Sequence, residues 1–174
     1  TPTGTPTNVR TNVADATSYG GELEVNWNPV ADFNVDVGLA LLDNEIDNFI
    51  SDNPEQVARR VGNELPDSPN ITFNFAVDYS HEIVSGWTAN FLVTGRYQDE
   101  AFKELDNFQA VPSFFDGTAK VGIQEPDGRW EIAGYVRNFT DDTYFTTLLA
   151  DENGNGLRIP AAPRTYGVSL SASF

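Results

Sequence analysis

The feature that most constrains this chain is a two-residue alternation of apolar and polar side chains, repeated in seven stretches. Alternation with period two is typical of a β-strand with one apolar face. Helical periodicity is weak, and we expect only a short helix around 54–61. We therefore predict an all-β, antiparallel up-and-down meander, with strands at about 16–28, 32–43, 70–83, 86–98, 111–123, 129–138 and 164–174.

The connections between these stretches alternate in length. The short ones are 28–32, 84–86 and 124–129, and the long ones are 43–69, 99–109 and 139–163. In a meander, this alternation places all short turns at one end and all long loops at the other. Outer-membrane β-barrels have this asymmetry, with short periplasmic turns and long extracellular loops. The pattern therefore predicts part of a transmembrane β-barrel in the bacterial outer membrane, with a periplasmic C-terminus.

Aromatic residues follow the same polarity. Trp27, Trp87 and Trp130 lie beside the short turns, whereas Tyr19, Tyr97 and Tyr166 lie towards the opposite ends of their strands. Two aromatic girdles at the two lipid–water boundaries produce this arrangement. A Trp at a strand end also caps the core of a soluble β-sandwich, but the shared asymmetry of all three favours a membrane barrel.

Charged residues alternate with the apolar ones and predict a wet lumen, although the solvated face of a half-buried soluble sheet gives the same alternation. More than half of the 26 acidic residues lie in the long connections. The strand charges opposite the apolar face are Asp36, Asp78, Arg96, Asp116, Lys120, Glu131 and Arg137. We predict that Val25, Phe73, Phe91, Val121 and Leu170 face lipid, and that Glu24, Asn74, Asn90, Lys120 and Ser169 face the lumen.

Composition excludes several function classes. A net charge of −16 with only 10 basic residues argues against a nucleic-acid partner. Cysteine is absent, so the chain has no disulfide and no thiolate metal site. His81 is the only histidine, and we find no Ser/His/Asp set, phosphate-binding loop or zinc spacing. We therefore expect no enzymatic activity, no cofactor and no metal.

One short stretch resembles part of a calcium site. DENGNG (151–156) matches the first half of a calcium-binding loop, but the twelfth position is Ala162 instead of the bidentate Glu. The stretch is also typical of a Gly/Asn-rich turn at a loop tip. We favour the turn, and leave calcium as the alternative.

Four motifs together resemble the TonB-dependent outer-membrane receptors. YVRNFTDDTYFTTL (135–148) is similar to the family's penultimate-strand signature, and PAAPRTYGVSLSASF (160–174) to its final strand. NVADATSYGGELEVNW, with Ala16, Gly21, Glu22 and Glu24, resembles an upstream strand of the family. GNELPDSPNITFNFAVDY (62–79) resembles its Gly-x-x-Leu-Pro-x-x-Pro strand entry. The four occur in the family's order along nearly the whole chain.

This resemblance implies a 22-stranded barrel plugged by an N-terminal domain. It also implies active uptake of a scarce ligand, such as a ferric siderophore, cobalamin or an oligosaccharide, driven by the TonB complex. Seven strands are about a third of such a barrel, and no plug domain is present. We therefore expect residues 1–174 to be a C-terminal barrel segment, without a signal peptide, that cannot transport on its own.

The resemblance also implies the partners. They are outer-membrane lipid and lipopolysaccharide, the barrel-assembly machinery acting through the C-terminal strand, and the TonB complex acting through the missing plug. The terminal aromatic Phe174 is then expected to be an assembly signal. The sequence names no ligand and no ligand-binding residue.

Two alternatives remain open at this point. The first is a small self-contained outer-membrane barrel or pore with residues 1–12 as an eighth strand, although TPTGTPT has two prolines and no apolar alternation. The second is a soluble β-sandwich that serves as a binding or adhesion module.

Overall fold

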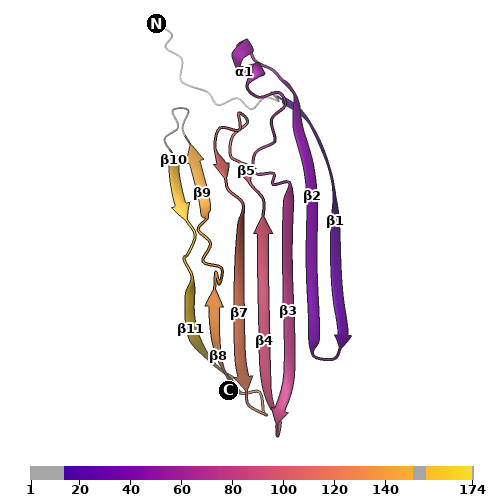
Figure 1. Cartoon of the computed structure of the whole chain (residues 1–174), viewed down its shortest axis with the longest axis vertical. Helices are drawn as coiled ribbons and strands as arrows, with labels where there is room; N and C mark the ends of the chain where they lie inside the picture. Colours follow the sequence, from indigo (N-terminus) through magenta and orange to yellow (C-terminus); the bar gives the residue numbers. More distant parts are fainter. Residues whose placement is uncertain (1–13, 151–155, 174) are drawn as a thin grey trace.

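A computed structural model describes residues 14–150 and 156–173, and it shows one long antiparallel sheet (Figure 1). The sheet has seven strands in the order β1-β2-β3-β4-β7-β8-β11. Their bounds are β1 Ala14–Val30, β2 Phe33–Phe49, β3 Ile71–Val84, β4 Trp87–Gln98, β7 Phe114–Gln124, β8 Trp130–Arg137 and β11 Thr165–Ala172. Consecutive members of this series are neighbours, so the predicted all-β, up-and-down meander is confirmed.

The long connections carry short elements of their own. They hold the helix α1 (Pro54–Ala58), the two-stranded sheet of β5 (Ala101–Phe102) with β6 (Ala110–Val111), and the hairpin of β9 (Phe145–Ala150) with β10 (Gly156–Pro160). Helix α1, which the sequence predicts as slightly longer, begins at Pro54 because the Asn53 side chain accepts a hydrogen bond from the Glu55 N–H at 3.0 Å. The four extra strands are too short or too irregular to show a two-residue alternation.

The largest difference from the expected bounds is the end of β2. The sequence predicts an end near residue 43, whereas the strand continues to Phe49. Its outer part, DNEIDNF, is acidic, yet β1 and β2 remain paired as far as Ala14 and Phe49. Backbone pairing with β1 sustains this extension. The following loop packs on it, since Ile46 is buried and bonded through its backbone to Gly62 and Asn63, and Arg60 lies over the ring of the buried Phe49. The hairpin therefore extends beyond the rest of the sheet.

Strand register separates the two faces cleanly. Residues that pair directly across an antiparallel ladder share a face. One continuous row runs Trp27, Val35, Val77, Val93, Ala119, Val136 and Tyr166. By the same pairing, Val25, Phe73, Phe91, Val121 and Leu170 lie on this apolar face, and Glu24, Asn74, Asn90, Lys120 and Ser169 lie on the opposite, polar face.

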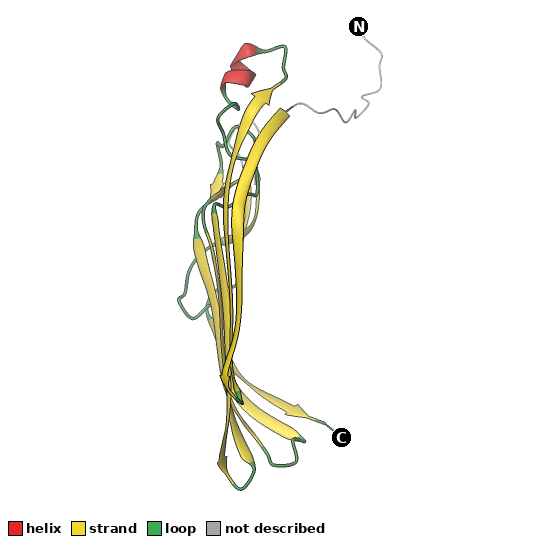
Figure 2. Cartoon of the chain, turned by 90° about the vertical axis from the view of Figure 1, so that its right-hand side faces the viewer, coloured by secondary structure: helices red, strands yellow, loops and turns green. Residues whose placement is uncertain are grey.

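The same row reveals a stagger between strands. It begins at Trp27, three residues before the end of β1, and finishes at Tyr166, the second residue of β11. A row of paired residues therefore shifts along the strand direction from the short-turn end at β1 towards the loop end at β11. Closing a sheet into a barrel requires such a stagger together with strand tilt. The sheet is also curved when seen from its side (Figure 2).

The large apolar side chains of the apolar face are solvent-exposed or half-buried. Leu170 is 72% exposed and Val121 is 51% exposed. Most of the buried apolar residues instead lie at the end of the sheet that carries the long loops, and include Ile46, Phe49, Ala101, Val111, Phe114 and Leu148. A β-sandwich would bury one face between two packed sheets, and the described residues place only short two-stranded sheets beside the large one. Among the described residues, no helix has the length and apolar character to cross a membrane.

Candidate functional site

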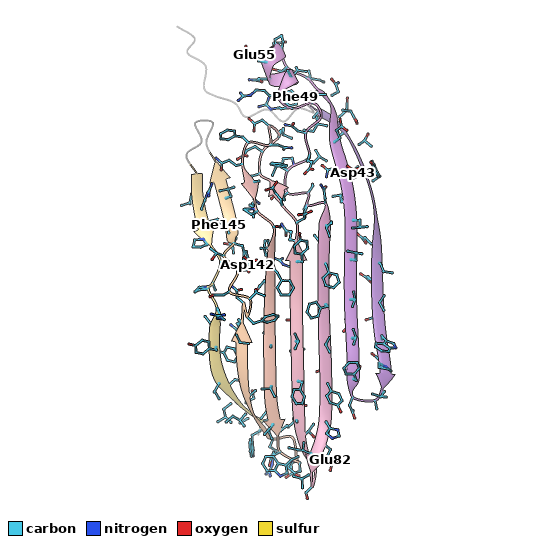
Figure 3. The ribbon with its side chains drawn as sticks, in the orientation of Figure 1. Asp43, Phe49, Glu55, Glu82, Asp142 and Phe145 are labelled. Atoms are coloured by element: carbon cyan, nitrogen blue, oxygen red, sulfur yellow. The ribbon has the colours of Figure 1, made fainter. Side chains whose placement is uncertain are left out.

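The three short turns lie at one end of the sheet and the three long loops at the other (Figures 1 and 3). Figure 3 marks the two ends, with Glu82 beside a short turn and Phe49 and Phe145 on the loop side. We call the loops 50–70, 99–113 and 138–164 the first, second and third long loops. Two cavities and several charged side chains lie at this loop end.

The first two loops interlock above the sheet. Asn63 Nδ2 donates to the carbonyl oxygens of Arg59 at 2.7 Å and Leu105 at 2.9 Å. The Asp67 N–H donates to the Phe102 carbonyl oxygen at 2.8 Å, and the Asp67 carboxylate forms an ion pair with Lys103. One backbone hydrogen bond and one ion pair, both at Asp67, therefore hold segment 67–69 over the polar face.

All three long loops border one cavity of about 450 Å³, which we call the three-loop pocket. Arg96, Gln98 and Phe114 reach it from β4 and β7. The loops contribute the remaining residues, Asp67, Pro69, Ala101, Lys103, Val111, Tyr144, Phe145 and Thr146. The pocket therefore lies where the polar face of the sheet meets the loops.

A stack of three side chains lines the three-loop pocket. The rings of Phe114 and Tyr144 are nearly parallel, at 4° and a centroid distance of 4.1 Å. On β4, the guanidinium of Arg96 lies 5.1 Å from the centroid of the Phe114 ring. Aromatic stacking and cation–π attraction both favour this order. Phe114 is only 5% exposed, so it anchors the stack.

The electrostatics of the pocket differ from those of the whole chain. Two of the 10 basic residues, Arg96 and Lys103, border it in a protein of net charge −16. Burial raises the pKa of the Tyr144 phenol, and the nearby Asp116 carboxylate raises it further, against an opposing effect of Arg96. Tyr144 therefore stays protonated at neutral pH, and its hydroxyl donates a hydrogen bond to the Asp116 carboxylate. Arg96 and Lys103, of which Lys103 is ion-paired with Asp67 at the same pocket, lie beside two aromatic rings and could hold an anionic ligand that has planar groups.

A second cavity of about 590 Å³ lies on the other side of segment 67–69. It is bordered by Ser18, Tyr19, Glu22 and Thr72 on the sheet and by Asp67, Ser68 and Pro69 on the first long loop. Asp67 and Pro69 border both cavities, so the segment is a partition between them. Within the described part of the chain, no group of three or more His, Asp or Glu residues could hold a metal ion.

The predicted girdle residues occupy the apolar face and lie outside the three-loop pocket. At the short-turn end, Trp87 and Trp130 meet edge to face, with ring centroids 5.3 Å apart. Trp27 contacts Phe33 in the same way, at 6.4 Å. Tyr19 and Tyr97 donate hydrogen bonds to Asp43 and Asp99, towards the loop end, and Tyr166 is near the start of β11.

Three predictions fall wholly or mainly outside the described residues. They are the assembly signal at Phe174, the eighth strand at 1–12, and the DENGNG stretch at 151–156, of which only the backbone of Gly156 is described, as the first residue of β10. The structure therefore leaves all three as predictions.

Sequence reasoning missed the residues of the three-loop pocket. It placed Arg96 on the polar face and quoted Tyr144 within a motif, but it named no binding residue. One available signal was the pair Phe114 and Phe115, since neighbouring residues of a strand point to opposite faces and one Phe must enter the polar side.

Comparison with known proteins identifies the fold family. Residues 1–139 match the sequence model of a family described as "TonB dependent receptor-like, beta-barrel". The chain belongs to the TonB-dependent receptor β-barrel family. The resemblance seen in the sequence is therefore confirmed, and residues 140–174, which include the final-strand motif, lie beyond the matched range.

Solved structures show the same fold. The ferric yersiniabactin uptake receptor FyuA from Yersinia pestis matches with a TM-score of 0.78 and 20% identity, over 94% of this chain and 24% of that one. The siderophore receptor PiuA from Acinetobacter baumannii gives 0.71 and 21%, over 91% and 22%. BauA, the ferric preacinetobactin receptor from Acinetobacter baumannii, gives 0.65 and 16%, over 90% and 22%.

The chain thus spans about a quarter of the length of these receptors. TonB-dependent receptors reside in the outer membrane, and the family and these neighbours are receptors and transporters. The present chain corresponds to part of such a barrel and the loops attached to it.

Proposed function

We propose that this chain is the C-terminal barrel segment of an outer-membrane receptor that takes up an anionic iron chelate of the siderophore class, with energy from the TonB complex. Family membership supports the receptor, and several structural neighbours are siderophore receptors by their names. Cobalamin and oligosaccharides, the other ligands that the sequence resemblance implies, carry less negative charge. Arg96 and Lys103 border the three-loop pocket, although Lys103 is paired with Asp67 there, and these cations favour an anionic chelate over them.

The orientation follows from the two ends of the sheet. In this proposal the long loops are extracellular, the short turns and the C-terminus are periplasmic, and the apolar face contacts lipid. The three tryptophans form the periplasmic girdle, while Tyr19, Tyr97 and Tyr166 belong to the outer one. The partners are outer-membrane lipid and lipopolysaccharide, the barrel-assembly machinery at the final strand, and TonB at the plug domain of the full-length receptor.

The single observation that carries the proposal is the three-loop pocket. Arg96 and Lys103 border it from a strand and from a loop, beside the stacked rings of Phe114 and Tyr144. A charged hydrogen bond contributes about 1.5–3 kcal/mol. An anionic chelate held by either cation should thus lose about tenfold to a hundredfold in affinity when that cation is removed.

The test uses the full-length receptor with Arg96→Gln or Lys103→Gln. Ferric yersiniabactin and ferric citrate serve as probes, and their binding and TonB-dependent uptake are measured. Arg129→Gln is the matched control, because Arg129 is a basic residue in the short turn 125–129, at the opposite end of the sheet. Both pocket variants should weaken binding, and the control should not.

Two results would contradict the proposal. If the pocket variants bind the probes as tightly as the unaltered receptor, the pocket has no part in ligand binding. Uptake that continues without TonB would instead favour the alternative of a self-contained pore.

A further inference from the structure

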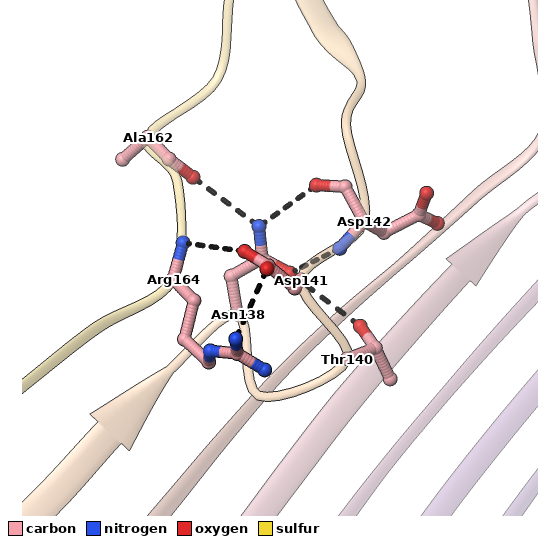
Figure 4. A network of polar contacts seen from close by, with 6 residues as sticks. All are labelled: Asn138, Thr140, Asp141, Asp142, Ala162 and Arg164. Carbon is pink, nitrogen blue, oxygen red and sulfur yellow. Dashed lines mark hydrogen bonds and ion pairs between the residues drawn. The ribbon is translucent and has the colours of Figure 1, made fainter.

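The third long loop opens with a compact turn directly after β8, and Asn138 lies at the centre of its hydrogen bonds (Figure 4). Its side chain is 3% exposed, and its backbone φ of +49° lies in the left-handed region that Asn tolerates. Asn138 Nδ2 donates to the carbonyl oxygens of Asp142 at 2.8 Å and Ala162 at 3.3 Å, and its Oδ1 accepts from the Asp142 N–H at 3.0 Å. One amide thus fixes both ends of the turn and the segment that enters β11.

The turn is also attached to its two neighbouring strands. Asp142 Oδ2 accepts a hydrogen bond from the Phe115 N–H on β7 at 2.9 Å. The Phe139 N–H donates to the Gly117 carbonyl oxygen at 3.1 Å, which continues the ladder along β7. On the other side, Asp141 forms an ion pair with Arg164 at 3.1 Å, just before β11. The turn therefore has a fixed position relative to β7 and β11.

These bonds connect the turn to the three-loop pocket. Asp142 precedes Tyr144 by two residues, and Phe115 directly follows Phe114. The Asp142–Phe115 hydrogen bond therefore joins the two chain segments that carry the stacked rings. A stack with ring planes within 4° and centroids at 4.1 Å requires both segments to be held in place.

We propose that Asp142 and Asn138 are positioning residues of the three-loop pocket, which hold the Tyr144 ring against Phe114 and beside Arg96. The inference rests on the proposed function, because the pocket is where the ligand binds. A turn that only connected β8 to β11 would not need the Asp142 carboxylate to accept a hydrogen bond from the backbone of β7. The bond from Asp142 to Phe115 assigns it the further role of placing Tyr144.

The experiment compares Asp142→Ala with Asp142→Asn in the full-length receptor. Both variants remove the charge of Asp142, but an Asn side chain keeps an oxygen that can accept from the Phe115 N–H. Asn138→Gly is a third variant, which preserves the left-handed backbone and removes the amide bonds. Resistance to unfolding in SDS shows whether each variant forms an intact barrel.

The first readout is the ionisation of Tyr144, measured as the difference in tyrosinate absorbance between each protein and the same protein carrying Tyr144→Phe. Asp116, Asp142 and Arg96 are the charged groups that act on this phenol. Asp142→Ala and Asn138→Gly should lower the pKa of the Tyr144 phenol towards the ordinary tyrosine value of about 10. In Asp142→Asn the pKa of Tyr144 should stay higher than in either of these variants. The same Tyr144 pKa in Asp142→Ala and Asp142→Asn would overturn the inference, whatever the ligand is.

The second readout is the binding of ferric yersiniabactin and ferric citrate. Loss of one aromatic stacking contact corresponds to about a threefold to tenfold weaker affinity, which we expect for Asp142→Ala and not for Asp142→Asn. A displaced Tyr144 titration with unchanged affinity would support the positioning of Tyr144 but contradict the proposed ligand site. Because the titration needs no ligand, the two failures are distinguishable.

Discussion

Gly20 and Gly21 are neighbours in β1, yet their surroundings differ sharply. A Cβ atom on Gly20 would lie 2.2 Å from the carbonyl oxygen of Leu41 and 3.2 Å from the Cα of Leu42. On Gly21 the same atom would have nothing within 4 Å. The contact at Gly20 is with backbone, so no side-chain rotation can relieve it.

This contrast gives a residue-scale prediction. Gly20→Ala should destabilise the full-length barrel by about 1–3 kcal/mol, the usual cost of forcing extra atoms into a packed site. Gly21→Ala is the matched control and should be neutral or slightly stabilising, because it restricts only the unfolded chain. The free energy of unfolding in urea, measured in the same detergent, compares the two. Equal values for both variants would contradict the packing described here.

Residue-scale packing is also where the sequence is least informative. The motif NFTDDTY was visible in the sequence, but nothing in it showed that Asp142 reaches the backbone of Phe115. Similarly, Lys103 and Asp67 are 36 positions apart, and only the folded loops bring them together. Contacts of this kind depend on loop paths, which a two-residue alternation does not encode.

At the scale of elements, the alternation predicts much more. It predicts the seven long strands and the face of each residue that the sequence analysis assigned to lipid or lumen. A shift by one position would reverse every face. The same reasoning fails for β5, β6, β9 and β10, and for the acidic outer part of β2. Backbone pairing and local burial form these segments, and neither leaves a periodic signature.

The two faces lead to an element-scale prediction on β4. Phe91 lies on the apolar face, and Thr94 lies three residues further along on the polar face. Phe91→Arg should destabilise the full-length barrel by about 2–4 kcal/mol, because a cation near the bilayer midplane is costly. Thr94→Arg is the control, since Thr94 lies on the polar face, which we propose lines the lumen, and this variant should change the unfolding free energy by less than about 1 kcal/mol.

Urea unfolding of both variants in phospholipid vesicles provides the measurement. A Phe91→Arg barrel with unchanged stability would show that this face does not contact lipid. A larger loss for Thr94→Arg than for Phe91→Arg would mean that the lipid and lumen faces are reversed.

At the scale of the whole chain, the sheet leaves two edges. β1 and β11 each have one neighbour in the strand order, so each carries a row of backbone N–H and C=O groups without a ladder partner in the described sheet. A bilayer cannot satisfy such groups, and an unpaired edge is also a template for aggregation. In the receptor that we propose, the remaining strands of the barrel pair with both edges.

We therefore expect the isolated 174-residue chain to aggregate in buffer without detergent. Its apolar face adds to this tendency, because Tyr166, Val168 and Leu170 are each more than 70% exposed beside the free edge of β11. The measurement is size-exclusion chromatography with light scattering, followed by thermal unfolding of any monomer. The full-length receptor in detergent is the control and should elute as a folded barrel. A monodisperse chain that unfolds cooperatively in plain buffer would contradict both the barrel-segment proposal and the lipid-facing role of this sheet.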